Sequence, residues 1–516
     1  MTDSNKIAVG IDLGTTFSVV AYLNSSGVPT TIPNTEGDLT TPSVVLFDDS
    51  NVVIGKEAVR AAPLEAESIA NHAKREMGNS HYSRRIAGQN LPPEVVQSLI
   101  LEKLKHDAES VIGPFDDVVI TVPAFFNEPR RKATEDAGKL AGLNVIDIIN
   151  EPTAAAIAYG FKNEFLSQGG ESQQKEIVLV YDLGGGTFDV TLMEINGKNY
   201  NTIATAGDVF LGGIDWDRRI VDFIAEEYKK KYRGLDPRDN LAGIHRLMRE
   251  AEDAKRALSA REQTTISFEH AGQGVRLSLT REMFESLTAD LLRRTIFTIS
   301  QMIKDAGLDR NQITRLLLIG GSSRMPVVKK MLEQETGLKP EKSLPVDEVV
   351  AHGAAIYAGL LQSESIDIEQ SIKISNVNSH SLGVLALDQQ TNRKKNSVII
   401  PRNTPLPVIR GKRFFTVKEN QKRVVVKVIE GGDATGKNAT IIGKCIVDNL
   451  PKGLPAQSEV LINFSYAQNG RLTVYTRLPQ AEREVQVTIE RVSGLDESAM
   501  REWGRRLDKP GGLFAK

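Results

Sequence analysis

The sequence reads Gly10-Ile11-Asp12-Leu13-Gly14-Thr15-Thr16 near its start and Tyr181-Asp182-Leu183-Gly184-Gly185-Gly186-Thr187-Phe188-Asp189 near its middle. Each stretch lies between two apolar runs, so each is predicted to form the tip of a β-hairpin. Glycine lets the backbone approach a ligand closely, and successive N–H groups in such a turn bind anions. Two facing tips would hold the phosphates of a nucleotide from both sides, with Asp12 and Asp182 able to hold hydrated magnesium. One copy alone would indicate an ordinary hairpin; two copies favour a binding site.

The composition is that of an ordinary globular protein. The 516 residues are 40% apolar and 25% charged with a formal net charge of −2, which gives no reason to expect nucleic acid or an anionic membrane as a partner. No apolar run reaches the ~20 residues that cross a bilayer, and the polar start Met1–Lys6 lacks the features of a secretory signal. The single cysteine, Cys445, is expected to be a small core residue. These features predict a cytoplasmic protein of roughly three domains.

Residues 1–362 alternate short β runs with amphipathic helices. This alternation predicts an α/β architecture, and its length suggests two lobes, one for each glycine-rich hairpin. The expected strands include Asp117–Val122, Ile177–Asp182 and Arg315–Ile319. The expected helices include Pro93–Val111, Arg130–Ala141, Ile220–Lys231 and Phe284–Ala306.

Beyond residue 362 the sequence changes character. Residues 363–380 are polar and are predicted to be a linker, with strand character at Ile372-Lys373-Ile374. Residues 381–495 show short apolar runs separated by Gly, Pro and Asn, which predicts an all-β sandwich. Residues 496–516 form a short tail, with one helix expected from Ser498 to Lys509. The runs expected to be strands are Leu382–Leu387, Ser397–Ile400, Val424–Ile429, Val460–Phe464, Leu472–Thr476 and Val485–Ile489.

Six motifs follow one another along the chain: Gly10–Thr16, Asn150–Ala156, Asp182–Asp189, Ala206–Asp208 with Leu211–Gly213, Ala254–Arg256 with Leu258 and Ser259, and Gly320–Pro326. In this order they closely resemble the seventy-kilodalton heat-shock chaperones, the DnaK-type family. The likeness runs over about residues 6–495. It implies an actin-like α/β ATPase of two lobes followed by a β-sandwich that binds extended peptides. The division of the chain drawn from its pattern agrees with this plan.

The resemblance implies an ATP site between the lobes. Asp12 and Asp182 match carboxylates that hold magnesium through water, and Lys74 matches the catalytic lysine. The phosphate loops are matched by Gly14, Thr15, Thr16 and Phe17 and by Gly184, Gly185, Gly186 and Thr187, with Gly212 and Gly213 in the next motif. The adenosine side is matched by Glu252, Lys255, Arg256 and Ser259 and by Gly320, Gly321, Ser322, Arg324 and Asp347.

Hydrolysis of a γ-phosphate requires an in-line water and positive charge on the equatorial oxygens. Lys74 would supply that charge together with magnesium, and Thr187 would donate a hydrogen bond. Three carboxylates, Glu151, Asp182 and Asp189, are alternatives for the group that orients the water or takes its proton. Without the surrounding motifs Lys74 would be interpreted as a surface lysine and Glu151 as a helix cap. The motifs favour the catalytic interpretation.

The β-sandwich is expected to bind extended polypeptides by backbone hydrogen bonds and apolar pockets. Six apolar residues align with the peptide cleft of the family: Val384, Leu387, Phe414, Val417, Val424 and Val426. Alternating apolar residues are also required by any sandwich core. About half of the six are therefore expected in the cleft.

Several features depart from the family pattern. About twenty residues follow the sandwich, too few for the helical lid of the family, so peptide exchange is expected to be fast even in the ADP state. The linker Ile372–Asn376 keeps two apolar residues where the family is leucine-rich, so docking of the linker on the ATPase lobes would bury less area. Whether the two domains are coupled therefore stays open. Pro123 and Arg131 do occupy the positions of the family's relay from nucleotide to linker.

Two further departures concern the ATPase. The stretch between Lys74 and Val118 is shorter than usual, so a standard nucleotide-exchange factor cannot be assumed. Ile214 stands where the family usually has glutamate.

Three classes of function stay open. The leading expectation is an ATP-dependent chaperone that hydrolyses ATP to control binding of unfolded polypeptides, with ATP or ADP and Mg²⁺ as cofactors and a J-domain protein as co-chaperone. The second is a nucleotide-gated protein with one dedicated partner and slow hydrolysis, which the polar linker favours. The third is a sugar kinase or actin-like filament protein, against which the β-sandwich after Ser381 and the motif at Glu252–Ser259 argue.

Overall fold

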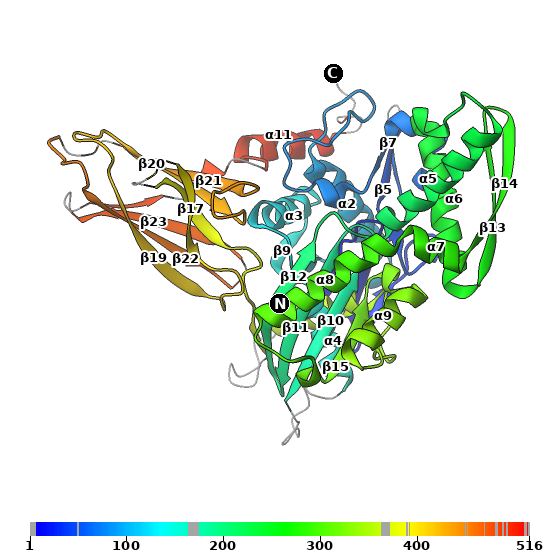
Figure 1. Ribbon diagram of the computed structural model, residues 1–516, viewed down its shortest axis with the longest axis horizontal. Coiled ribbons are helices and arrows are strands. Elements are labelled where there is room, and N and C mark those ends of the chain that lie inside the picture. Colours follow the sequence, from blue (N-terminus) through cyan, green and yellow to red (C-terminus); the bar gives the residue numbers. More distant parts are fainter. Residues whose placement is uncertain are drawn as a thin grey trace.

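The computed structural model describes residues 7–48, 51–163, 175–362, 372–388, 391, 393–448, 450, 452–468, 470–479, 483–487, 490–491, 494–509 and 513. Its element order confirms the expected fold class, because mixed α/β sheets are followed by antiparallel β-sheets (Figure 1). Within the described part of the chain no helix has both the length and the apolar character needed to span a membrane.

The first glycine-rich hairpin belongs to a six-stranded sheet of order β3-β2-β1-β8-β9, with β4 paired to β2. β1 pairs antiparallel with β2 and parallel with β8. Helices α2 and α3 share a buried cluster with this sheet, and we call the unit the first lobe. The bounds are β1 Val9–Asp12, β2 Phe17–Leu23, β3 Pro29–Ile32, β4 Thr41–Pro42, β8 Asp117–Val122, β9 Asn144–Asn150, α2 Pro93–Ile112 and α3 Glu128–Leu140.

A small three-stranded sheet of order β6-β5-β7 adjoins the first lobe. It leads into the short 3₁₀ helix η2, which carries Lys74 and Arg75. The bounds are β5 Val44–Asp48, β6 Asn51–Ile54, β7 Ile69–Asn71, α1 Lys56–Ala61 and η2 Ala73–Glu76.

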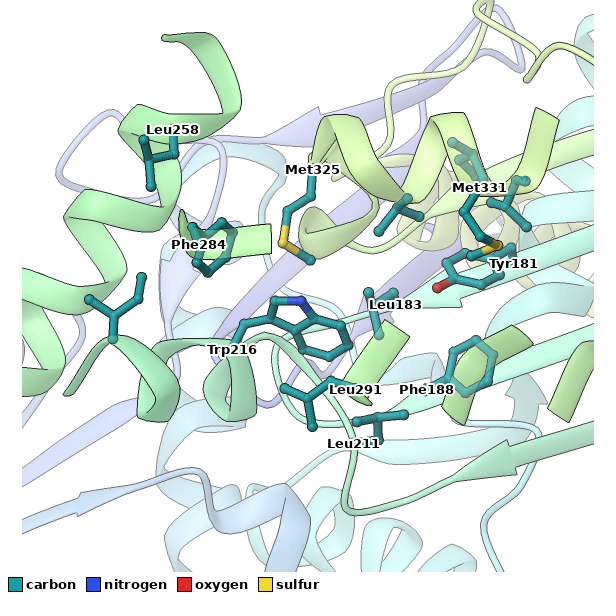
Figure 2. Packing of buried hydrophobic residues seen from close by; sticks show 14 of the residues in the cluster. Tyr181, Leu183, Phe188, Leu211, Trp216, Leu258, Phe284, Leu291, Met325 and Met331 are labelled. Atoms are coloured by element: carbon teal, nitrogen blue, oxygen red, sulfur yellow. The ribbon is translucent and has the colours of Figure 1, made fainter. Parts of the chain in front are cut away.

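The second glycine-rich hairpin joins β10 and β11 in a five-stranded sheet of order β15-β10-β11-β12-β16. We call this sheet and the helices packed on it the second lobe. Figure 2 shows its core around the fully buried Trp216, which lies beside Met325, Leu183 and Leu291. The bounds are β10 Glu176–Leu183, β11 Phe188–Asn196, β12 Asn199–Asp208, β13 Gln263–His270, β14 Gln273–Thr280, β15 Arg315–Ile319, β16 Lys373–Ser375, α5 Gly213–Lys231, α6 Leu241–Ala260, α7 Arg281–Leu287, α8 Ala289–Asp305 and α9 Pro326–Thr336.

Helices α4 (Glu151–Lys162) and α10 (Val349–Gln362) join the two lobes through a buried cluster that contains residues of both sheets. A Cβ on Gly10 would lie 2.2 Å from the Ala355 nitrogen, and one on Gly353 would lie 1.8 Å from the Ala154 carbonyl oxygen. Glycine at these two positions therefore allows α10 to approach β1 and α4 closely.

The C-terminal part is a sandwich of two antiparallel sheets, β18-β17-β20-β21-β25 and β19-β22-β23-β24. Apolar residues from both sheets, among them Val428, Cys445 and Phe464, fill one buried cluster, which confirms Cys445 as a core residue. The bounds are β17 Leu382–Leu387, β18 Lys394–Ile400, β19 Val408–Phe415, β20 Val424–Glu430, β21 Thr440–Val447, β22 Glu459–Tyr466, β23 Leu472–Leu478, β24 Arg483–Val487 and β25 Glu490–Arg491.

The sandwich is docked on the first lobe. The buried carboxylate of Glu430, at the end of β20, accepts a hydrogen bond of 3.0 Å from the backbone N–H of Glu128 in the first turn of α3. The first N–H groups of a helix have no partner within the helix, and the Glu430 oxygen satisfies one of them. The ring of His380 lies 4.2 Å from that of Phe125, with its Nε2 3.0 Å from the Phe125 carbonyl oxygen.

The linker is docked on the second lobe. β16 pairs parallel with β12, and Ile374 packs against the cluster shared by both lobes. Gln468, in the sandwich, donates a hydrogen bond of 2.7 Å to the Ile374 carbonyl. The strand expected at Ile372-Lys373-Ile374 is thus present, shifted by one residue; residues 363–371 of the expected linker lie outside the described residues.

Helix α11 (Glu497–Leu507) returns from the sandwich to the first lobe, where it lies beside α3 (Figure 1). Trp503 and Leu507 pack against the first lobe's core, and Leu513 is buried in it. Gln89 donates a hydrogen bond of 2.7 Å to the Leu513 carbonyl. The segment that follows the sandwich is therefore bound to the first lobe.

Three expectations about elements were wrong. The helix expected over Phe284–Ala306 is two helices, because Thr288 leaves the helical conformation and its hydroxyl donates to the Phe284 carbonyl. The helix expected from Ile220 begins at Gly213, where its first residues bond to the second glycine-rich tip. Strands β19 and β21 were missed because charged residues and glycine interrupt their alternation.

We expect docking of the sandwich to weaken as the pH rises from 6.5 to 8. Burial raises the pKa of Glu430 from 4.5 to about 8. A carboxyl whose pKa is higher in the docked state favours docking while it is protonated. Between the ordinary and the raised pKa, the equilibrium constant for docking therefore falls by up to about tenfold per pH unit. His380, whose pKa burial lowers to about 4, weakens docking only below its ordinary 6.5. Hydrogen exchange of the β16 amides, corrected for intrinsic rates, measures the effect.

Glu430→Gln should remove this pH dependence and protect β16 better than the wild type at pH 8. The exposed Glu419→Gln, in the same sandwich, is the control and should keep the wild-type profile. An identical profile in the Glu430 variant would contradict the assignment.

Candidate functional site

The tips of the two glycine-rich hairpins face each other between the lobes. A Cβ on Gly185 would lie 2.3 Å from the Thr16 hydroxyl, and one on Gly186 would lie 2.4 Å from the Thr15 methyl. Only glycine permits this approach. Within the second tip, the Gly184 N–H donates to the Thr187 carbonyl at 3.1 Å. The structure therefore brings the two predicted phosphate loops together.

The start of α5 supports the second tip. The N–H of Gly213 donates to the Gly184 carbonyl at 2.9 Å, and the N–H of Ile214 donates to the Gly185 carbonyl at 2.8 Å. A Cβ on Gly212 would lie 2.5 Å from the Gly186 carbonyl carbon. Because Ile214 contributes its backbone here, the replacement of the family's usual glutamate leaves this contact intact.

Three carboxylates and one lysine are buried close to the tips, and a fourth carboxylate, that of Asp12, is half-buried beside them. Lys74 Nζ donates a hydrogen bond of 2.6 Å to Glu151 Oε1 at the start of α4, and both side chains are buried. Asp12 Oδ1 accepts from the Thr121 hydroxyl at 3.2 Å. Asp182 and Asp189 face each other in the register of β10 and β11.

Asp189 has one free oxygen. Its Oδ1 accepts a hydrogen bond of 2.7 Å from the backbone N–H of Phe125. Its Oδ2 is buried without a hydrogen-bond partner in the described part of the chain. A buried polar atom of this kind indicates that a further group belongs in the site.

The electrostatics of the cluster favour a bound cation. Burial, followed by the neighbouring Glu151, raises the pKa of Asp12 to about 7, that of Asp189 to about 8 and that of Asp182 well above its ordinary value. Burial alone would lower the pKa of Lys74, but the carboxylates of Glu151 and Asp12 outweigh it and raise that pKa. One ammonium thus faces four carboxylates in a buried site.

Oxygen donors with surplus negative charge suit a hard divalent cation. Over the described residues, no three His, Cys, Asp or Glu side chains gather into a direct metal site. Mg²⁺ commonly keeps several waters and binds through one or two carboxylates, so the magnesium site at Asp12 and Asp182 stays a prediction.

The residues predicted for the adenosine side line two walls. On α6, Lys255 Nζ donates to the Gly213 carbonyl at 3.1 Å and to Asp217 Oδ2 at 2.8 Å. The turn after β15 forms the other wall: a Cβ on Gly213 would lie 2.3 Å from the Ser322 hydroxyl. Both walls thus meet the start of α5.

The remaining predicted residues continue these walls. Arg324 pairs with Asp347, and a Cβ on Gly321 would lie 3.6 Å from Asp347 Oδ1. Gly320 has a φ of +78° and lies against Leu183 and Asp182, where a side chain would clash. Ser259 donates to the Lys255 carbonyl at 3.2 Å, and Glu252 pairs with Arg256 at 2.6 Å.

One predicted residue of the first tip reaches α6. The Arg256 guanidinium lies 5.1 Å from the ring centroid of Phe17, a cation–π contact between the lobes. The segments that carry the predicted nucleotide residues thus contact one another across the two lobes, and their role in nucleotide binding stays a prediction.

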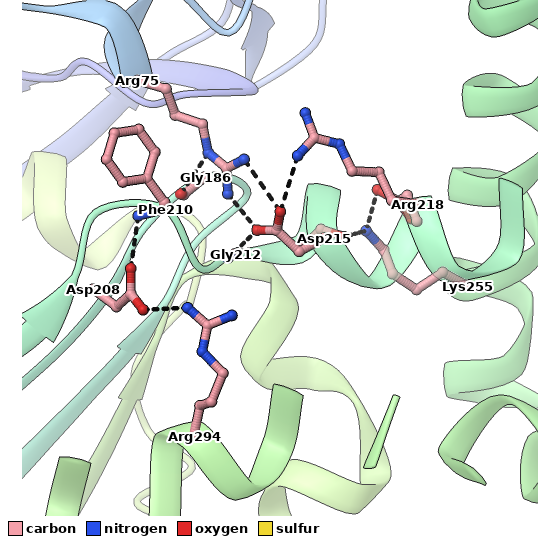
Figure 3. A network of polar contacts seen from close by, with 11 residues as sticks. Arg75, Gly186, Asp208, Phe210, Gly212, Asp215, Arg218, Lys255 and Arg294 are labelled. Carbon is pink, nitrogen blue, oxygen red and sulfur yellow. Dashed lines mark hydrogen bonds and ion pairs between the residues drawn. The ribbon is translucent and has the colours of Figure 1, made fainter. Parts of the chain in front are cut away.

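Arg75 was missed, although it follows Lys74 directly. Its Nε donates to the Gly186 carbonyl at 2.7 Å, and its guanidinium pairs with Asp215 on α5 (Figure 3). The Asp215 carboxylate in turn accepts the Gly212 N–H at 2.9 Å. Arg75 therefore links the first lobe to the second phosphate loop. The sequence offers a single indication of this role, which is that the guanidinium of an arginine can pair with a carboxylate through two hydrogen bonds.

Arg131 connects the site to the sandwich. Its guanidinium donates to Asn150 Oδ1 at 2.7 Å, next to Glu151, and to the carbonyls of Ala124 and Phe126 at 3.3 and 3.1 Å. Arg131 also lies close enough to the buried Glu430 for its positive charge to offset part of the rise that burial causes in the pKa of that carboxyl. The segment around Phe125, which binds both Asp189 and His380, forms a parallel connection.

The six predicted peptide-cleft residues divide into two groups. Val384 and Val426 are buried in the sandwich core, and Phe414 and Val424 pack against it. Leu387 and Val417 are exposed by 52% and 65%. The cleft assignment stays a prediction for all six.

Comparison with known proteins agrees with this arrangement. The family model described as Hsp70 protein matches residues 8–508. The chain is 38% identical to the chaperone protein DnaK of Thermotoga petrophila and of Thermotoga maritima, and 39% identical to that of Thermotoga neapolitana. Each match extends over 479 residues, 91% of this chain and 78% of the relative. The chain therefore belongs to the Hsp70 family.

Proposed function

We propose that this protein is a chaperone that binds and hydrolyses ATP to control its hold on unfolded or extended polypeptides. The observation that carries the proposal is the pair of opposed glycine tips beside a largely buried cluster of four carboxylates and Lys74. Backbone N–H groups bind phosphate oxygens, and the cluster supplies the charges that phosphoryl transfer needs. Membership of the Hsp70 family supports the same function.

The residues divide the chemical work. Lys74 neutralises negative charge on the γ-phosphate, while Glu151 holds the Lys74 ammonium at 2.6 Å. Thr187 donates its hydroxyl to the same phosphate. Among the three carboxylates considered for water activation, Asp189 has a free buried oxygen, so we assign it the role of proton acceptor.

Asp12 and Asp182 are proposed to hold Mg²⁺ through its water ligands. The bound cation would neutralise the phosphate charge that the protein alone leaves uncompensated.

Coupling to the sandwich is proposed to run through contacts already described. Asn150, adjacent to Glu151, binds Arg131, which lies beside Glu430 of the sandwich. A nucleotide shifts docking only by binding the docked and undocked states differently. Movement of Glu151 or Asp189 on binding would supply that difference. A J-domain protein is the proposed co-chaperone; nucleotide exchange is assigned to no partner.

The dedicated-partner protein is the second candidate. The observation that favours it is the burial of Val384 and Val426, which leaves fewer of the predicted cleft residues open to varied peptides. A single partner would leave ATP turnover indifferent to generic unfolded peptides, whereas the chaperone would respond to them.

Calorimetric titration with ATP and ADP at millimolar Mg²⁺ tests the proposal most directly. Binding of both nucleotides is expected. No heat of binding at millimolar nucleotide would refute it.

Lys74→Ala should lower the turnover number for ATP by about a hundredfold or more, because a preorganised positive charge is lost at the transition state. Nucleotide affinity should change much less. A single-turnover assay with radiolabelled ATP measures both quantities. Lys330→Ala removes an exposed lysine on α9 and should hydrolyse ATP at the wild-type rate. Wild-type turnover in the Lys74 variant would refute the assigned role.

Ile374→Asp should abolish stimulation of ATP turnover by an unfolded apolar peptide and a J-domain protein. The new carboxylate would lie where Ile374 packs on the shared cluster, so β16 would no longer dock. Basal turnover should stay close to the wild-type value, since β16 pairs with the Asn199 end of β12 and the glycine-rich tip lies at the Asp208 end. Steady-state turnover with and without the two stimulants measures the effect.

Lys373→Asp is the matched control, since Lys373 lies on the same strand with its side chain exposed. Stimulation should persist in this variant. Equal stimulation in both variants would show that linker docking does not transmit the peptide signal.

A further inference from the structure

The phosphate side of the cleft carries an arginine that none of the roles above uses. Arg130, on α3 of the first lobe, is only 9% exposed. Its Nη1 is buried without a hydrogen-bond partner among the residues that the structure describes. A buried charge without a carboxylate beside it is costly unless other groups stabilise it.

Two aromatic rings provide that stabilisation. The guanidinium carbon of Arg130 lies 5.2 Å from the ring centroid of Phe126 and 5.4 Å from that of Phe210. Both distances fall within the ≈ 6 Å over which cation–π attraction acts. Burial and the neighbouring Arg75 lower the pKa of Arg130 to about 10, so the side chain stays charged at neutral pH.

The two rings belong to different lobes. Phe126 lies just before α3 in the first lobe, whereas Phe210 lies between β12 and α5 of the second, two residues before Gly212. The turn of Phe210 is held in place, because Asp208 accepts the Phe210 N–H at 2.9 Å and pairs with Arg294 on α8 (Figure 3).

Phe210 is 59% exposed, which is unusual for a phenylalanine that only stabilises its own lobe. Its ring lies against the Arg130 guanidinium of the opposite lobe. The contact also lies next to the Arg75 bridge, which joins the same two lobes at Gly186 and Asp215.

We propose that Arg130 and Phe210 form a clasp between the lobes on the phosphate side of the cleft, and that this clasp slows nucleotide release. The inference rests on the nucleotide binding proposed above. Opening of the cleft would carry Phe210 away with the second lobe while Arg130 and Phe126 stay with the first. Nucleotide release that requires opening must therefore break the contact between the Phe210 ring and the Arg130 guanidinium.

The test is the dissociation of a fluorescent ADP analogue from the full chain, chased with excess ADP in a stopped-flow instrument. Phe210→Ala should speed release about fivefold, as expected for loss of one partly exposed cation–π contact. Phe210→Tyr keeps the ring and should release at the wild-type rate. Phe297→Ala, which removes another exposed phenylalanine of the second lobe, is the control and should also match the wild type.

The double variant makes the test specific. Arg130→Met keeps an apolar stem without the charge and should release as fast as Phe210→Ala. Adding Phe210→Ala to Arg130→Met should then give no further increase. Independent effects that multiply in the double variant would overturn the clasp, as would wild-type release from Phe210→Ala alone.

Failure of the two proposals can be told apart. A wild-type chain that takes up no ADP analogue would refute nucleotide binding and the clasp together. Normal uptake with release indifferent to Phe210 would refute the clasp alone. Phe210 is a surface residue, so its variant remains a fair test even if Arg130→Met lowers the stability of the fold.

Discussion

The architecture depends on the close approach of two hairpin tips that belong to different sheets. At Gly185 and Gly186 any side chain would overlap Thr16 or Thr15, so the backbone of the second tip lies directly against the threonine side chains of the first. This approach fixes how far apart the two sheets lie at one edge. Helices α4 and α10 fix it at the other side, again through glycine at Gly10 and Gly353. Tight contacts at glycine thus set the spacing between the two sheets on both sides of the site.

Charge determines what such a cleft can hold. Three buried carboxylates and the half-buried Asp12 lie close to a single ammonium, and one of their oxygens has no hydrogen-bond partner among the residues that the structure describes. Burying so much negative charge is unfavourable in isolation, which is reflected in the raised pKa values of Asp12 and Asp189. A site that is costly when empty has more to gain from a cationic or metal-bearing ligand. The same carboxylates are connected to the sandwich: Asp189 through Phe125, and Glu151 through its neighbour Asn150. The proposed ligand site and the docking interface therefore depend on the same residues.

Sequence reasoning succeeded where a chemical requirement leaves a local signature. The glycine tips, the strands Asp117–Val122 and Arg315–Ile319 and the family motifs are of this kind. It failed where tertiary contacts decide. Thr288 breaks a continuous apolar pattern through its own side-chain bond, and β19 is a largely exposed strand with charged residues, so its alternation is hidden. Arg75 and Arg130 look like ordinary surface arginines in the sequence. Their importance comes from partners eighty or more residues away, which no local pattern reveals.

The sandwich is attached at two points that belong to different lobes. Its entry strand β16 is part of the second lobe's sheet, whereas helix α11 and Leu513 at its exit are bound to the first lobe. A domain attached in this way connects the two lobes. Any rotation of one lobe against the other must therefore distort the sandwich or break one of its attachments. The docked sandwich therefore opposes separation of the two lobes, although it lies outside the proposed nucleotide site.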